Sequence, residues 1–197
     1  MKLQAAAVAA FAALAFAAPA SAEVLDNFQI KVGVSGILPN ESGDPIDVDI
    51  SDEWVPSLQI EYFFNDNISA ELLCCVATHD VASTGGLDLG EVTHFPPTVT
   101  LKYRWTNFGQ FEPYVGAGVN YTAFIDDEPP AGMTIDYDDS FGPALQAGFD
   151  YRIDEHWGVN FDVRRIWINT DVTINGTIQD EVDIDPWVVS TSVAYRF

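Results

Sequence analysis

The chain ends on a segment, Pro186 to Phe197, in which apolar side chains alternate with small or polar ones. Alternation with a period of two places every second side chain on the same face of a β-strand. The residues of this face are Trp187, Val189, Thr191, Val193, Tyr195 and Phe197. A face about ten residues long with aromatic rings at both ends is typical of a strand that crosses a bilayer. We expect it to close a membrane barrel and to be recognised by the barrel assembly machinery. A half-buried terminal strand of a soluble protein is the alternative.

The N-terminal segment has the pattern of a secretory signal peptide. Lys2 precedes an apolar run from Ala5 to Ala18, and Ala20-Ser21-Ala22 is a small-x-small cleavage site. We predict a cleaved signal over residues 1–22 and one β-barrel domain over residues 23–197. The later sequence offers no uninterrupted apolar stretch of helical spanning length. A chain that crosses the membrane without such a helix must form a closed barrel, because hydrocarbon satisfies no backbone hydrogen bonds.

Seven earlier segments share the period-2 pattern. They are Phe28–Val34, Leu58–Phe64, Ile68–Cys74, Val99–Trp105, Val115–Tyr121, Phe141–Tyr151 and Trp157–Val163. Short turns alternate with four long connections, which are Pro39–Pro56, Val76–Pro97, Ile125–Ser140 and Thr170–Asp185. This rhythm predicts an all-β fold: a closed eight-stranded antiparallel transmembrane β-barrel with short periplasmic turns and long extracellular loops. Its expected location is the outer membrane of a Gram-negative bacterium. A soluble barrel of the lipocalin kind would instead line a cavity with its apolar set.

Charge is distributed unevenly along this acidic chain, whose formal net charge is −22. The four long connections hold 20 of the 30 acidic residues and contain neither Lys nor Arg. We therefore exclude nucleic acid as a partner, because binding it requires a basic surface. Beside anionic lipopolysaccharide the acidic loops should repel unless divalent cations bridge the two. Alternating carboxylates such as Asp47-Val48-Asp49 could hold a hard cation weakly, but we interpret the loops as a solvated acidic surface without a defined metal site.

The opposite face of each predicted strand should point into the barrel lumen, where charged residues of both signs gather near the periplasmic ends and at mid-height. The bases are Lys31, Lys102, Arg104, Arg152, Arg164 and Arg196, and the acids are Glu61, Glu71, Glu112, Asp150 and Asp162. Unpaired charges inside a narrow barrel are costly, so we expect a mutually paired network. An eight-stranded barrel has room only for side chains, and such a network should therefore block a continuous water pore. These charges could also serve only to fill and stabilise the barrel.

Higher in the lumen the inward residues become apolar. They are Ile37, Leu73, Ile166, Ile168 and Val188, with Phe124 at the rim. We expect an apolar chamber that opens to the outside, and a hydrophobic solute could leave it only sideways, between strands. Tight packing of the lumen is the alternative. The apolar parity slips after Val163, where Arg165 joins the outward set and Ile166 the inward one, and a bulge would explain the slip.

Several ordered motifs resemble those of a known family. They are His94-Phe95-Pro96-Pro97-Thr98-Val99-Thr100-Leu101-Lys102-Tyr103, Pro113–Thr122, Asp66-Asn67-Ile68 with Glu71-Leu72-Leu73, and Asp185–Val188 with Tyr195-Arg196-Phe197. Together they resemble the outer membrane protein W family (OmpW/AlkL) over essentially the whole mature chain. The resemblance implies an eight-stranded barrel that admits small hydrophobic molecules and releases them laterally. Leu73 matches the family's inward leucine, whereas Arg164 stands where family members can carry an aromatic residue.

Three classes of function remain to be compared. Passive uptake of small hydrophobic molecules is the leading hypothesis, and a structural or adhesive barrel with a filled lumen is the second. A lipid-modifying enzyme would need a His beside a Ser and an acid. We predict none, because His156 lies in a short turn and His79 and His94 lie in the second long connection. Neither a cofactor nor an oligomeric state is assigned. Cys74 and Cys75 are adjacent and point to opposite faces, so no disulfide is expected between them.

Overall fold

The computed structural model describes residues 25–40, 42–44, 48–83, 88–130, 132, 134–176 and 178–197. The signal peptide expected over residues 1–22 lies outside these ranges, as do Glu41 and Asp47 of the first acidic connection. Within the described ranges, no helix combines the length and hydropathy needed to cross a bilayer.

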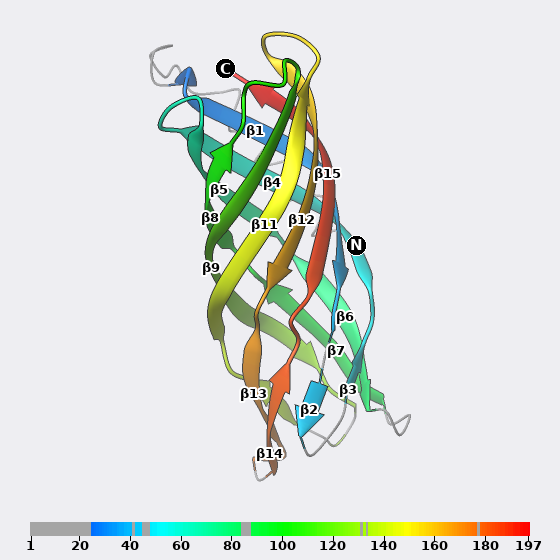
Figure 1. Ribbon diagram of the computed structural model, residues 1–197. Coiled ribbons are helices and arrows are strands. Elements are labelled where there is room, and N and C mark those ends of the chain that lie inside the picture. Colours follow the sequence, from blue (N-terminus) through cyan, green and yellow to red (C-terminus); the bar gives the residue numbers. More distant parts are fainter. Residues whose placement is uncertain are drawn as a thin grey trace.

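Eight antiparallel strands form a closed barrel, as the period-2 segments predict. They are β1 (Phe28–Leu38), β4 (Glu53–Phe63), β5 (Ile68–Cys75), β8 (Thr98–Arg104), β9 (Phe111–Glu128), β11 (Ser140–Arg152), β12 (Trp157–Ile166) and β15 (Trp187–Arg196). Each strand pairs with the next, and the first pairs with the last, with Val32 opposite Val193. Figure 1 shows the strands tilted around a common axis, with the C-terminus and the short turns at the same end. We call this the turn end and the opposite one the extension end.

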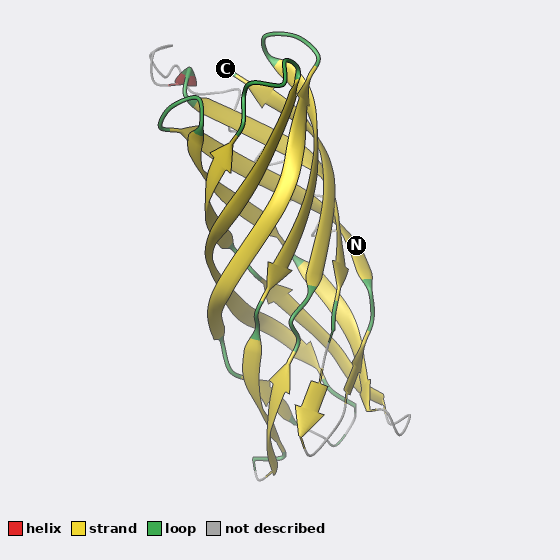
Figure 2. Ribbon diagram, viewed as in Figure 1, coloured by secondary structure: helices red, strands yellow, loops and turns green. Residues whose placement is uncertain are grey.

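The four long connections lie where the sequence predicts them, but they also contain strands that the sequence analysis did not predict. Their described residues form further strands: β2 (Ser42–Asp44), β3 (Val48–Ile50), β6 (Ala77–Ser83), β7 (Asp88–Phe95), β10 (Ile135–Tyr137), β13 (Asn169–Ile174) and β14 (Ile178–Asp183). They continue the barrel beyond its wall, so that much of the extension end is also strand (Figure 2).

The extension divides into two groups of strands. β3, β6 and β7 pair in that order and join the long β9, whereas β10, β13, β14 and β2 form a separate four-stranded sheet. Apolar side chains from both groups form one buried set, the upper apolar cluster. Its members are Ile50, Val81 and Val92 from the first group and Ile135, Val172, Ile174 and Val182 from the second.

The membrane-facing side of the wall follows the predicted parity. In β8 the residues Val99, Leu101 and Tyr103 are exposed, while the residues between them are buried. Exposed aromatic side chains stand near both margins, including Tyr103 and Trp157 toward the turn end and Trp54, Phe141 and Trp187 toward the extension end. Such girdles are typical of membrane barrels.

The parity slip in β12 is not a bulge. The pairing of β12 with β11 and with β15 runs without a register shift through Arg164 and Arg165. Arg164 and Ile166 both point inward and are buried, and Arg165 lies between them on the other face. The apolar pattern changes because the lumen itself changes from charged to apolar at this height.

Candidate functional site

Glu61 and Glu71, on the neighbouring strands β4 and β5, are the centre of a buried charge network in the lumen. Lys31 Nζ lies 2.7 Å from Glu61 and 2.5 Å from Glu71, and Lys102 Nζ lies 3.1 Å and 2.9 Å from the same two carboxylates. Arg104 completes the first with a 2.8 Å contact to Glu61, and Arg164 completes the second with a 2.5 Å contact to Glu71.

Three further acids extend this network toward the neighbouring strands. Asp150 lies 2.7 Å from Arg104, and Asp162 lies 2.7 Å from Arg164. Glu112 lies 3.0 Å from Arg152, whose side chain is half exposed at the turn end. The resulting charged floor consists of five bases (Lys31, Lys102, Arg104, Arg152, Arg164) and five acids (Glu61, Glu71, Glu112, Asp150, Asp162). All members except Arg152 are almost fully buried, and with Arg152 included the formal charges of the floor balance.

Arg196 is the one expected member that stays outside the ionic network. None of the described acids lies within 4 Å of its guanidinium, which instead stacks over the Phe63 ring at 3.9 Å. Arg104 lies over the same ring at 4.7 Å and already occupies Glu61 and Asp150. The cation–π contact with Phe63 therefore takes the place of an ion pair for Arg196.

Tyr114 is a central residue that we did not identify from the sequence. It is buried, its hydroxyl donates to Asp162 at 2.8 Å, and Lys102 Nζ stands 3.7 Å from its ring centroid. Gln146 is a second such residue, because its amide donates to both Glu71 and Asp162. The inward parity of their strands was the available signal, but neither side chain carries a formal charge that would mark it as part of an ionic network.

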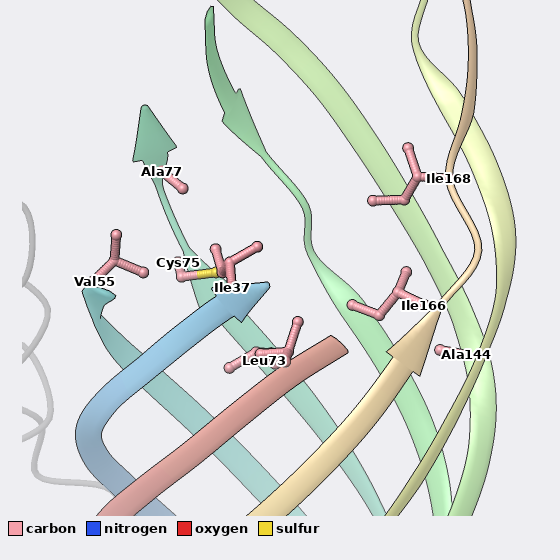
Figure 3. Packing of buried hydrophobic residues seen from close by; sticks show 9 residues of the cluster. Ile37, Val55, Leu73, Cys75, Ala77, Ala144, Ile166 and Ile168 are labelled. Carbon is pink, nitrogen blue, oxygen red and sulfur yellow. The ribbon is translucent and has the colours of Figure 1, made fainter. Parts of the chain in front are cut away.

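Apolar side chains fill the lumen directly above the charged floor. This lower apolar cluster consists of Ile37, Val55, Leu73, Cys75, Ala77, Ala144, Ile166, Ile168 and Val188. Figure 3 shows its side chains converging from several strands toward the interior. Each member is at most 6% exposed. An open chamber would leave solvent-accessible surface on its lining, so these residues pack against one another.

Phe124 belongs to a different level from the other expected chamber residues. Its ring packs against the upper apolar cluster and stacks on Tyr137, with 5.4 Å between the ring centroids. Four members of the lower cluster, namely Val55, Cys75, Ala77 and Ala144, were not anticipated. They are small or lie outside the strand limits that we inferred from the sequence.

The described residues contain no group of three or more His, Cys, Asp or Glu side chains that could hold a metal ion. Among the same residues, no serine hydroxyl bonds to any of the three histidines. A hollow of about 610 Å³ lies against the apolar, membrane-facing side chains Leu101, Tyr103, Val115 and Leu145. Its lining also includes Lys102 and Gln146, and it shares no residue with either apolar cluster of the lumen.

A closed, tilted eight-stranded barrel with apolar walls and aromatic girdles defines a transmembrane outer-membrane protein. Comparison with known proteins agrees: the model of the OmpW family matches residues 25–197. The chain belongs to the OmpW family. Its turn end is therefore periplasmic, its extension end is extracellular, and its location is the outer membrane of a Gram-negative bacterium.

Individual relatives cover most of the chain. The chain is 42% identical over 185 residues to the uncharacterized outer-membrane protein y4mB of Sinorhizobium fredii, which covers 88% of this chain and 81% of that protein. It is 33% identical to outer membrane protein W of Vibrio cholerae, over 96% and 97% of the two chains. The crystal structure of OprG from Pseudomonas aeruginosa superposes with a TM-score of 0.79 at 28% identity, covering 86% of this chain and 95% of OprG.

Proposed function

We propose that this barrel takes up small hydrophobic molecules passively across the outer membrane. The observation that carries the proposal is the order of the two layers in the lumen, with the lower apolar cluster placed directly above the charged floor. A polar solute entering from outside would lose hydrogen bonds to water against Leu73, Ile37 and Ile166, whereas an apolar one would not. The charged floor then stops either kind of solute from continuing straight into the periplasm.

The proposed exit is lateral, between β9 and β11. Their backbone ladder ends where Thr122 faces Ser140. Beyond this level β9 pairs with β7, and β10 pairs with β13. A solute could leave here without breaking backbone hydrogen bonds between β9 and β11. Phe141, which is 71% exposed, lies on the membrane-facing side of this end of the ladder. Because the lower apolar cluster is tightly packed, entry requires its side chains to move apart.

Uptake by Leu73→Asp barrels tests the proposal. Leu73 is 1% exposed within the cluster, and an unpaired carboxylate there would make the environment of an apolar guest worse by several kcal/mol. We expect uptake of an alkane-like probe into vesicles to fall at least tenfold relative to wild type. Leu73→Met, which preserves volume and polarity, should retain uptake.

The same experiment distinguishes hydrophobic uptake from the main alternative, a structural or adhesive barrel with a filled lumen. The low solvent exposure of the lower apolar cluster favours this alternative. Folded barrels are first selected by their heat-modifiable mobility in gels. Equal uptake by wild type and Leu73→Asp, or uptake by neither above protein-free vesicles, would support the filled barrel. A hydrophilic probe of the same size serves as the control and should be excluded by all variants.

A further inference from the structure

Two histidines lie between the lower and upper apolar clusters. His79 on β6 and His94 on β7 stack their rings with centroids 5.1 Å apart and planes 12° apart. Both are buried, at 2% and 7% exposure. They line a cavity of about 10 Å³ together with Ile37, Ile168, Phe124 and Thr122. Burying polar imidazole rings among mostly apolar side chains costs desolvation free energy. Because the two rings lie on the proposed solute path, their position indicates a function beyond packing.

The hydrogen bond made by His79 fixes which of its ring nitrogens carries the proton. Nδ1 lies 2.6 Å from the backbone oxygen of Ser51. A carbonyl oxygen only accepts, so Nδ1 must be the donor. Burial lowers the pKa of His79, and burial also lowers the pKa of His94, to about 3. Both rings are therefore neutral at ordinary pH, and Nε2 of His79 is a bare acceptor.

This acceptor has no partner within the described part of the chain, although it is buried. The nearby hydroxyl of Thr122 does not supply one, because it donates to Asn120. A cavity of this volume is about the size of one water molecule, and Thr122 and His94 line it beside His79. A hydroxyl or N–H group attached to an apolar body needs only the His79 acceptor and would displace such a water.

We propose that Nε2 of His79 is a binding site for hydrophobic solutes that carry one hydrogen-bond donor, such as phenols and aliphatic alcohols. The proposal rests on the proposed uptake function and defines its preferred substrates. The donor group bonds to His79 while the apolar body displaces side chains such as Ile37 and Ile168. The barrel then discriminates between two solutes of equal size by a single hydrogen bond.

The test compares 1-naphthol with 1-methoxynaphthalene, which has the same ring system but no donor. Uptake is measured above protein-free vesicles, whose outer leaflet contains lipopolysaccharide to slow direct permeation. We expect the naphthol-to-ether uptake ratio to fall about three- to tenfold in His79→Phe, the equilibrium ratio that one net hydrogen bond supplies. His79→Gln, which keeps an acceptor, should preserve part of the preference. His156→Phe, in an exposed periplasmic turn away from this cavity, is the matched control and should leave the ratio unchanged.

A second readout reports binding without transport. In the folded wild-type barrel with ¹⁵N-labelled histidine, 1-naphthol should shift the Nε2 resonance of His79, and the ether should not. An unchanged uptake ratio in His79→Phe together with an unmoved resonance would overturn the inference, leaving hydrophobic uptake intact. If neither probe enters the wild type, the uptake function fails. The resonance alone then decides whether the site exists.

Discussion

Glu71 lies at the point where the charges of the lumen converge. It contacts Lys31, Lys102 and Arg164, three bases from three different strands, and accepts a further hydrogen bond from Gln146. Each of these side chains has lost its water, so the carboxylate is the group that keeps several buried positive charges compensated. Removing one partner of a buried ion pair destabilises the fold more than replacing both partners, because it leaves an uncompensated buried charge.

Glu71→Gln therefore has a specific expected cost. Neutralising this carboxylate leaves the buried cations in excess and should lower the free energy of unfolding by about 3–5 kcal/mol. Urea unfolding in lipid vesicles provides the measurement. The double variant Glu71→Gln/Lys102→Met should lose less, because it removes a matched pair. Glu155→Gln, in an exposed periplasmic turn, should change stability by less than about 0.5 kcal/mol. A double variant less stable than the single one would contradict this account.

Much of the charged floor could be predicted from the sequence, because strand parity decides which side chains point inward and the signs were nearly balanced. The exceptions have local causes. Arg196 shares the inward parity, but it is the last residue of β15, and its guanidinium lies over the Phe63 ring with none of the described acids within 4 Å. Tyr114 and Gln146 are neutral, and their importance depends on contacts across the lumen that no single strand reveals.

At the scale of the strand, β9 approaches β8 unusually closely at Gly118. A Cβ atom at this position would lie 1.9 Å from the backbone oxygen of Val99 and 2.6 Å from the Cα of Thr100. Gly118→Ala must therefore displace the backbone of β8. We expect the free energy of unfolding to fall by about 1–3 kcal/mol, the usual range for overpacking. Ala117→Val adds more volume on the exposed, lipid-facing side and should have little effect. Equal losses for both variants would show that strand spacing is not the cause.

We expect Phe197 at the end of the C-terminal strand to be recognised by the barrel assembly machinery, an effect that can be observed only in cells. Phe197 donates its backbone N–H to Phe28, and its ring packs edge-on against Tyr195 with centroids 5.0 Å apart. Phe197→Ala removes the ring but keeps the backbone bond. If assembly machinery recognises this residue, the variant should accumulate less in the outer membrane while the purified chain refolds normally in detergent. Unchanged levels in cells would rule out that role, and failed refolding in vitro would show a purely structural one.

The strands of the extension were harder to predict than those of the wall. In β13 and β14, Val172, Ile174 and Val182 alternate with polar and acidic residues, but the apolar runs are short. Acidic side chains reduce the overall hydropathy of these segments, which made them look like loops. What stabilises them is the facing group of strands, since Val81 and Val92 complete the same buried cluster. That partnership joins residues 80 to 101 positions apart and has no local signature.

At the scale of the whole molecule, charge and apolarity are separated by height. The floor of the lumen is charge-balanced, the layer above it is apolar, and the extracellular extension carries most of the excess acid. Cations attracted to the extension would therefore meet an apolar layer and then a floor with no net charge to draw them in. Under the proposed uptake function, such an order of layers would admit apolar solutes as far as the middle of the barrel and oppose the passage of ions at every step.

Planar-bilayer recordings test this separation. The wild-type barrel should show no steady ion conductance, because buried ion pairs occlude the lower lumen. Removing a matched pair at the centre, Glu71→Ala with Arg164→Ala, creates space lined by polar groups, which water can fill. We expect this variant to conduct in brief openings, when the side chains of the lower apolar cluster move apart as solute entry also requires. Glu112→Ala with Arg152→Ala removes the same charges at the periplasmic mouth, where Arg152 is already half exposed, and should stay closed. A conducting wild type, or a central double variant that remains silent, would show that the charged floor is not the barrier to ions.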